Sequence, residues 1–168
     1  MKANAIPSHA EAMLALPESD VSKAEAVLRE MQSILRAEYA VADPNITLTL
    51  TPEGKAASAL TEHSTRRVCA FLCLAPNGVA AMSMDIPGLV QTSDNLGIFR
   101  VENGHLTGTF SVRSSVATQK QMLLTRIRLL CEGLDGTATN TSSYPAWEYR
   151  RESPLRDTMV RVFTAQYG

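Results

Sequence analysis

Histidine, cysteine and aromatic residues are all scarce in this sequence, and each shortage excludes a class of function. The 168 residues include three histidines, three cysteines and 5% aromatic residues. His9, His63 and His105 fall in three different predicted elements, and the sequence has no His-x-Asp motif and no adjacent Glu-Glu pair. A zinc site needs three or four ligands that converge on one point. No metal site is therefore expected within this chain.

The cysteines provide neither a disulfide framework nor a catalytic thiol. Cys69 and Cys73 are four residues apart in an apolar segment predicted to be helical, where cysteine packs as a small hydrophobic residue. Cys131 also lies beside an apolar run, whereas a nucleophilic cysteine must be exposed and activated. The sequence also lacks a Gly-x-Ser-x-Gly motif, a Gly-rich phosphate loop and a dinucleotide-binding motif. This cysteine usage suits a reducing, cytoplasmic setting.

The net charge and the short length of the apolar runs exclude two further classes of partner. The formal net charge is −1, so no basic surface is expected for nucleic acid or an anionic membrane. The apolar runs are too short to span a bilayer, and MKANAIPSHA lacks the apolar region of a signal peptide. With 45% hydrophobic and 20% charged residues, the composition is that of one soluble domain with its own core.

Residues 91–116 contain the most clearly specified unit, a β-hairpin that leads into a helix. Asn103-Gly104 predicts a two-residue type I′ turn, because that turn needs positive φ at both central residues. The register follows from the turn and predicts three cross-strand pairs: Glu102 with His105, Phe99 with Gly108, and Gly97 with Phe110. Each aromatic ring is then expected to cover a glycine on the partner strand.

The remaining sequence alternates predicted strands and helices. Strands are predicted over residues 3–16, 46–50 and 137–142, with a short strand inside 79–89. Helices are predicted between residues 20 and 43, over 57–74 and 116–132, and from the Ser153-Pro154 cap to the C-terminus. Mixed pairing with the helices on one face predicts an α+β two-layer sandwich of ferredoxin-like type.

Arg113 is the best functional candidate from the residues alone. The register places it at a strand end, on the face away from the core and opposite Asp94. A guanidinium in that position suits bidentate binding of a carboxylate, and the alternative is a cross-strand ion pair with Asp94. Asn4 and Asn95 lie near strand starts, where their amides could donate hydrogen bonds to a substrate carbonyl or serve turns.

Five segments occur in a fixed order along the chain: NAIPSHAEA, TSDNLGI, FSVRSSV, QKQMLL and YPAWEYR-x-x-SPLRD. Together they resemble the aminoacyl-histidine dipeptidases, a family of cytosolic zinc metallopeptidases. The resemblance is carried mainly by residues 91–168 and by residues 4–50. Enzymes of this family have a catalytic domain with two metal ions, interrupted by an inserted α+β lid or dimerisation domain.

The resemblance implies that this chain is mostly lid. The family's metal ligands and catalytic glutamate lie on the catalytic domain, and none of those motifs is present here. Residues 1–152 then correspond to an N-terminally incomplete lid domain, and residues 153–168 to the first helix of the returning catalytic domain. The parent would use two zinc ions to hydrolyse dipeptides with a C-terminal histidine. This chain would hold no cofactor and would be inactive alone.

The resemblance also assigns roles and partners. Arg113 matches the lid arginine that binds the substrate's C-terminal carboxylate, Asn4 matches a polar residue that holds the reacting carbonyl oxygen, and Asn95 is a further substrate-binding candidate. No catalytic residue is assigned. The expected partners are the catalytic domain of the same polypeptide, the dipeptide and, because exposed strand edges favour self-association, a second copy.

One alternative is a stand-alone α+β binding or oligomerisation module without catalytic activity. In that module the C-terminal helix would pack natively on the domain. In a lid fragment, by contrast, the apolar stripe of this helix has lost its partner. The stripe consists of Leu155, Met159, Val162 and Phe163.

Overall fold

The computed structural model describes residues 3–168 of the chain. Their contacts divide them into two compact units. The larger unit contains the N-terminal residues up to His9 together with Glu62–Gly168, and the smaller one is Ala10–Thr61. All the strands of the described residues belong to the larger unit.

The smaller unit is built on one long helix. A 3-10 turn, Glu18–Asp20, leads into α1, Val21–Glu38. The strand predicted over residues 46–50 is wrong, because this extended segment has no partner strand within its unit. Side chains of α1 satisfy part of its backbone instead: Arg36 Nε donates to the Ile46 carbonyl at 2.6 Å, and Gln32 Oε1 accepts from the Leu48 amide at 2.7 Å.

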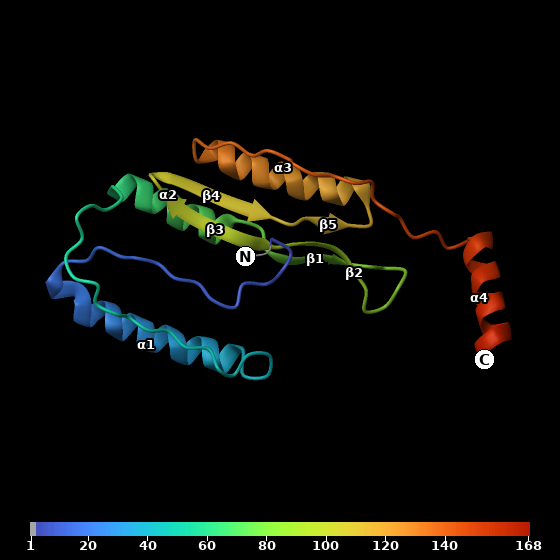
Figure 1. Ribbon diagram of the computed structural model, residues 1–168, viewed down its shortest axis with the longest axis horizontal. Helices are drawn as coiled ribbons and strands as arrows, with labels where there is room; N and C mark the ends of the chain where they lie inside the picture. Colours follow the sequence, from blue (N-terminus) through green and yellow to red (C-terminus); the bar gives the residue numbers. More distant parts are fainter. Residues whose placement is uncertain (1–2) are drawn as a thin grey trace. The chain divides into compact units, whose positions relative to one another are not determined.

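The larger unit contains two antiparallel sheets (Figure 1). One has the strand order β1-β2-β5, and the other is the hairpin β3-β4. The strands are β1 Gly78–Met82, β2 Val90–Asp94, β3 Leu96–Glu102, β4 His105–Phe110 and β5 Arg113–Ser114. The short strand predicted inside residues 79–89 therefore exists as part of β1.

The predicted hairpin turn is confirmed. Asn103 and Gly104 both have positive φ, 52° and 75°, as a type I′ turn requires. Two of the three predicted cross-strand pairs are present: Glu102 with His105 and Phe99 with Gly108. The local sequence thus specified the closed end of the hairpin.

The open end of the hairpin contains a β-bulge that changes the register. Ile98 pairs with Thr109, but Leu96 pairs with Phe110, so β3 has one extra residue, Gly97, at this point. The predicted pairing of Gly97 with Phe110 is therefore wrong. A β-carbon built on Gly97 would lie 2.3 Å from the Ala3 carbonyl oxygen, so this glycine meets the N-terminal segment and not a ring.

The bulge also changes the partner of Arg113. Arg113 pairs with Ser93 in the β2-β5 ladder, and the predicted pairing with Asp94 is wrong by one residue. Because neighbouring residues of a strand point to opposite faces, this shift places Asp94 on the face away from Arg113.

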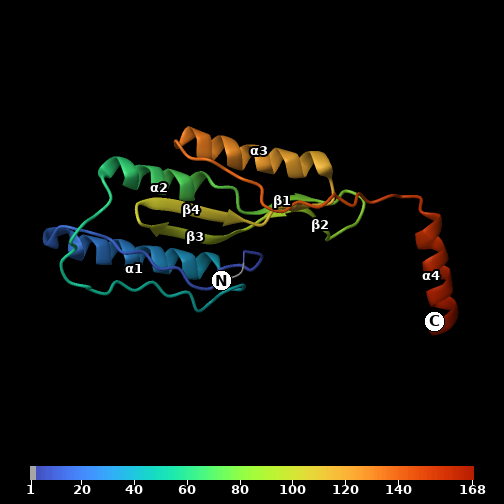
Figure 2. The ribbon, with the colours of Figure 1, turned by 45° about the horizontal axis from the view of Figure 1, so that its top comes forward.

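Two helices cover one face of the larger unit, as Figure 2 shows. They are α2, Glu62–Leu74, and α3, Ala117–Gly133. The α2 ring of Phe71 stacks on Phe99 with centroids 5.6 Å apart and meets Phe110 edge-on at 6.1 Å. Phe71, Leu123 and Ile127 are the buried apolar residues of the described chain. The α+β prediction is confirmed.

Several further sequence predictions are wrong. Helix α2 begins at Glu62 and not near residue 57, and residues 3–16 and 137–142 are irregular, because neither segment pairs with a strand. Cys69 and Cys73 are exposed, since α2 packs through Phe71 and turns these two thiols outward.

The last helix, α4, spans Pro154–Tyr167. Its predicted cap is confirmed, because Ser153 Oγ accepts a hydrogen bond from the Arg156 amide at 3.3 Å. All four apolar residues of its predicted stripe are exposed: Leu155, Met159, Val162 and Phe163. None of the helices within residues 3–168 is both long and apolar enough to cross a membrane.

Candidate functional site

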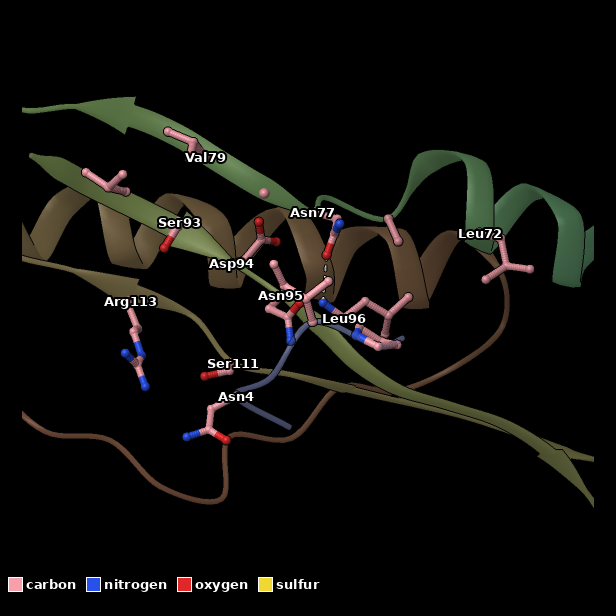
Figure 3. A pocket seen from close by; sticks show the side chains of 15 residues that line it. Asn4, Leu72, Asn77, Val79, Ser93, Asp94, Asn95, Leu96, Ser111 and Arg113 are labelled. Carbon is pink, nitrogen blue, oxygen red and sulfur yellow. Dashed lines mark hydrogen bonds between the residues drawn. The ribbon is translucent and has the colours of Figure 1, made fainter. Parts of the chain in front are cut away.

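A cavity of about 710 Å³ lies in the larger unit, and Arg113 is among its lining residues (Figure 3). The N-terminal segment, the end of α2, and strands β1, β2 and β5 all contribute to its wall. Its lining residues are Asn4, Ile6, Pro7, Leu72, Ala75, Asn77, Gly78, Val79, Val90, Ser93, Asp94, Asn95, Leu96, Ser111 and Arg113. All three residues proposed from the sequence for substrate binding are among them.

Arg113 begins β5 with an exposed side chain. Within residues 3–168, no carboxylate forms an ion pair with its guanidinium, and the ion pair with Asp94 that the sequence offered as an alternative is absent. Its ladder partner is Ser93, whose short side chain leaves the guanidinium open to solvent. The N–H donors of an exposed arginine without an ion pair are available to a ligand.

Asn4 lies in the irregular N-terminal segment, with an exposed side chain. Figure 3 shows its amide and the Arg113 guanidinium on the same side of the strands. Among the hydrogen bonds of the described residues, none uses the Asn4 amide. Arg113 and Asn4 therefore present a free cation and a free carboxamide to one cavity.

Asn95 has a different environment. Its Nδ2 donates to the Ala3 carbonyl at 2.9 Å and to the Ala5 carbonyl at 3.0 Å. Both hydrogens of the Asn95 amide are thus used within the chain. A direct contact of Asn95 with substrate stays a prediction.

Asp94 is the buried carboxylate of this region. It is 5% exposed, and its Oδ2 has no hydrogen-bond partner among the described residues. Burial raises the pKa of the Asp94 carboxyl above its ordinary value, while a backbone hydrogen bond and the charge of Arg126 act in the opposite direction. Thr92, two residues before Asp94 in β2, is also buried, and its Oγ1 forms a hydrogen bond with the Gln119 side chain of α3.

Three polar residues of the cavity were missed from the sequence. Ser93 and Ser111 lie on the same face as Arg113, and Asn77 Oδ1 accepts a hydrogen bond from the Leu96 amide at 2.9 Å. Strand alternation alone places Ser111, two residues before Arg113, on the same side.

The cavity presents one cation without an ion pair, and the described residues provide no cluster of metal ligands. No three His, Cys, Asp or Glu side chains of residues 3–168 lie close enough to hold a metal ion. The chemistry available is hydrogen bonding from the Arg113 guanidinium and the Asn4 amide, which together suit a carboxylate beside a carbonyl oxygen.

The fold is similar to that of part of a solved dipeptidase. The structure matches the crystal structure of an aminoacylhistidine dipeptidase from Vibrio alginolyticus with a TM-score of 0.85. The match has 22% identity and covers 91% of this chain but 31% of that protein. At this identity the likeness concerns the fold.

A second dipeptidase is similar to this chain in sequence. The chain is 27% identical over 164 residues to the cytosol non-specific dipeptidase of Escherichia coli strain K12, covering 95% of this chain and 34% of the relative. No family model matches the chain. The chain thus spans about a third of the length of the dipeptidases that it matches, and the resemblance inferred from its five segments is confirmed.

Proposed function

We propose that this chain is the lid of a larger cytosolic metallodipeptidase and that it recognises the substrate's C-terminal carboxylate. Arg113 would bind the carboxylate, and Asn4 would bind the carbonyl oxygen of the peptide. The whole enzyme would hydrolyse dipeptides with a C-terminal histidine. The chain itself would close the active site and exclude water without hydrolysing anything.

The unpaired guanidinium of Arg113 is the observation that carries this proposal. A surface arginine on a sheet commonly pairs with a nearby carboxylate, and Asp94 is adjacent in sequence to its partner Ser93. The bulge directs that carboxylate to the opposite face, so the charge of Arg113 stays available. An exopeptidase must recognise a free terminal carboxylate, and a cation on a lid can bind that carboxylate and bring it to the active site as the lid closes.

Residues 3–168 do not fit a metal centre, so two zinc ions would be bound by other segments of the parent enzyme. Their chemistry would be the activation of a water molecule. The partners that we propose for this chain are the catalytic domain of the same polypeptide, the dipeptide, and a second copy of the enzyme. The division into a lid of residues 1–152 and a returning helix is part of the same proposal.

The exposed stripe of α4 supports the lid over the stand-alone module. Met159 and Phe163 line a shallow apolar depression of about 270 Å³ on this helix. Exposed apolar faces of this kind mark a missing contact. In the proposed enzyme the catalytic domain would cover them.

Ligand binding tests the recognition step. The 168-residue chain, labelled with ¹⁵N, is titrated with glycyl-histidine and, separately, with glycyl-histidinamide, which lacks the carboxylate. We expect shift changes around Arg113 with the acid only, and their loss in Arg113→Ala. Arg161→Ala, which removes an exposed arginine of α4, is the matched control and should behave as the unmutated chain. Equal shifts with acid and amide would contradict carboxylate recognition.

Two further measurements test the lid assignment. An antibody against this chain should detect, in lysate of the source cells, a band well above the mass expected for 168 residues. The purified chain supplied with zinc should not hydrolyse glycyl-histidine. A band at the mass of the chain would favour the stand-alone module, and turnover abolished by a chelator would contradict the claim that the chain is inactive.

A further inference from the structure

We propose that Asn95 is a positioning residue, which fixes Asn4 in the place where it can share one ligand with Arg113. This inference rests on the proposed function, because it concerns the same cavity. It assigns Asn95 a role that acts through another residue and involves no direct contact with substrate.

The hydrogen bonds of Asn95 enclose Asn4 on both sides. The two carbonyls that accept from Asn95 Nδ2, at 2.9 and 3.0 Å, belong to Ala3 and Ala5, the residues immediately before and after Asn4. The N-terminal segment that carries Asn4 forms no strand, so no backbone hydrogen bonds of a sheet hold it. One side-chain amide therefore holds the peptide group that joins Ala3 to Asn4 and the peptide group that joins Ala5 to Ile6, and this restricts where the Asn4 side chain can point.

Asn95 is itself fixed relative to Arg113. Its backbone exchanges two hydrogen bonds with Ser111: the Asn95 amide donates to the Ser111 carbonyl at 3.1 Å, and the Ser111 amide donates to the Asn95 carbonyl at 2.9 Å. Ser111 lies two residues before Arg113 on the same extended segment. The paired residues Asn95 and Ser111 thus position both groups: Asn95 holds the segment that carries Asn4, and Ser111 precedes Arg113 in the sheet.

The bulge at Gly97 makes room for this arrangement. A β-carbon at Gly97 would meet three backbone atoms of Ala3, at 2.3, 2.7 and 2.8 Å. The N-terminal segment therefore approaches the strand as closely as a glycine permits, and it does so two residues from Asn95. The close approach at Gly97 and the hydrogen bonds from Asn95 both involve this segment, and both include the Ala3 carbonyl.

The chemistry requires an amide at position 95. An aspartate there would have no N–H to donate, and its carboxylate would face two carbonyl oxygens. It would also add a negative charge to the wall of the cavity that binds the ligand's carboxylate. Asparagine provides two donors and remains uncharged.

A double-mutant cycle tests the proposal. Dissociation constants for glycyl-histidine are measured by ¹⁵N shift titration for the unmutated chain, Asn95→Ala, Asn4→Ala and the double variant. We expect Asn95→Ala to weaken binding up to about tenfold, roughly the value of one hydrogen bond. In the Asn4→Ala background the same change should alter binding by less than about twofold, because residues that act through one another are non-additive.

A measurement without ligand separates this proposal from the proposed function. In Asn95→Ala, ¹⁵N relaxation should show the Asn4 backbone amide becoming mobile, while Asn140→Ala, which removes an exposed asparagine of an irregular segment, leaves it unchanged. An Asn4 that stays ordered, or equal effects of Asn95→Ala in both backgrounds, would overturn the positioning role. Failure of the unmutated chain to bind glycyl-histidine would instead overturn the proposed function.

Discussion

Arg113 pairs with Ser93 across the β2-β5 ladder, one residue away from the acidic Asp94. With Asp94 as its partner, the guanidinium would be neutralised within the sheet and would offer little to a ligand. The single extra residue in β3 thus determines that Arg113 faces the cavity unpaired and that Asp94 is buried.

Gly97→Ala should displace the N-terminal segment. The added methyl would lie 2.3 Å from the Ala3 carbonyl oxygen, so the segment or the strand must move. Forced packing of this kind costs about 1–3 kcal/mol. We expect lower stability toward urea and altered amide shifts of Ala3 and Ala5.

Gly133→Ala is the matched control for that change. A β-carbon at Gly133 has nothing within 4 Å, and the residue lies in α3, where alanine is the better helix former. This control should be neutral or stabilising. If both variants behaved alike, the close approach of Ala3 to Gly97 would be wrong.

Asp94→Asn should stabilise the chain at neutral pH. Because burial raises the pKa of the Asp94 carboxyl, the folded chain holds this proton more tightly than the unfolded chain. The stability that the protonated Asp94 carboxyl contributes is then fully present below about pH 4, the ordinary pKa range of aspartate. This contribution falls as pH rises through the raised pKa of Asp94. Removing an unpaired buried charge is worth about 1–3 kcal/mol.

Urea unfolding of both chains between pH 3 and pH 8 measures this effect. The difference should vanish at the acid end, where Asp94 is protonated and equivalent to asparagine. Asp43→Asn, at an exposed aspartate of the smaller unit, should give no such difference. A variant less stable than the unmutated chain at pH 7 would mean that attraction to Arg126 outweighs burial.

Phe71→Ala should unfold much of the larger unit. Phe71 is 4% exposed, stacks on Phe99 and meets Phe110, and therefore joins α2 to both strands of the hairpin. Removal of a buried phenylalanine costs about 3–5 kcal/mol. Leu74→Ala, in the same helix but 65% exposed, should cost far less. Circular dichroism during urea unfolding distinguishes the two.

The sequence predicted the parts of this fold that depend on local chemistry. Asn103-Gly104 defined the hairpin turn, and Ser153-Pro154 defined the start of α4. Gly97 was interpreted as space for the ring of Phe110, although an isolated glycine in a strand also indicates a bulge or a close backbone approach. Its actual neighbour, Ala3, lies far away in sequence, and no local pattern reveals such a contact.

The sequence predicted only some of the residues that line the cavity. Arg113 and Asn4 were proposed because their residue types and the family resemblance pointed to carboxylate and carbonyl binding, and both line the cavity. The positioning role that we propose for Asn95 depends on two carbonyls, of residues 3 and 5, that only the folded chain brings to it.

The contact between Asn95 and Ala3 has a consequence for how the chain is made. The two residues are 92 positions apart, so on the ribosome the N-terminal segment leaves the exit tunnel long before the strand that holds it has been synthesised. The cavity therefore cannot form in a nascent chain that ends before the hairpin. Such an incomplete product would lack both the Asn95 amide that holds Ala3 and Ala5 and the Arg113 side chain.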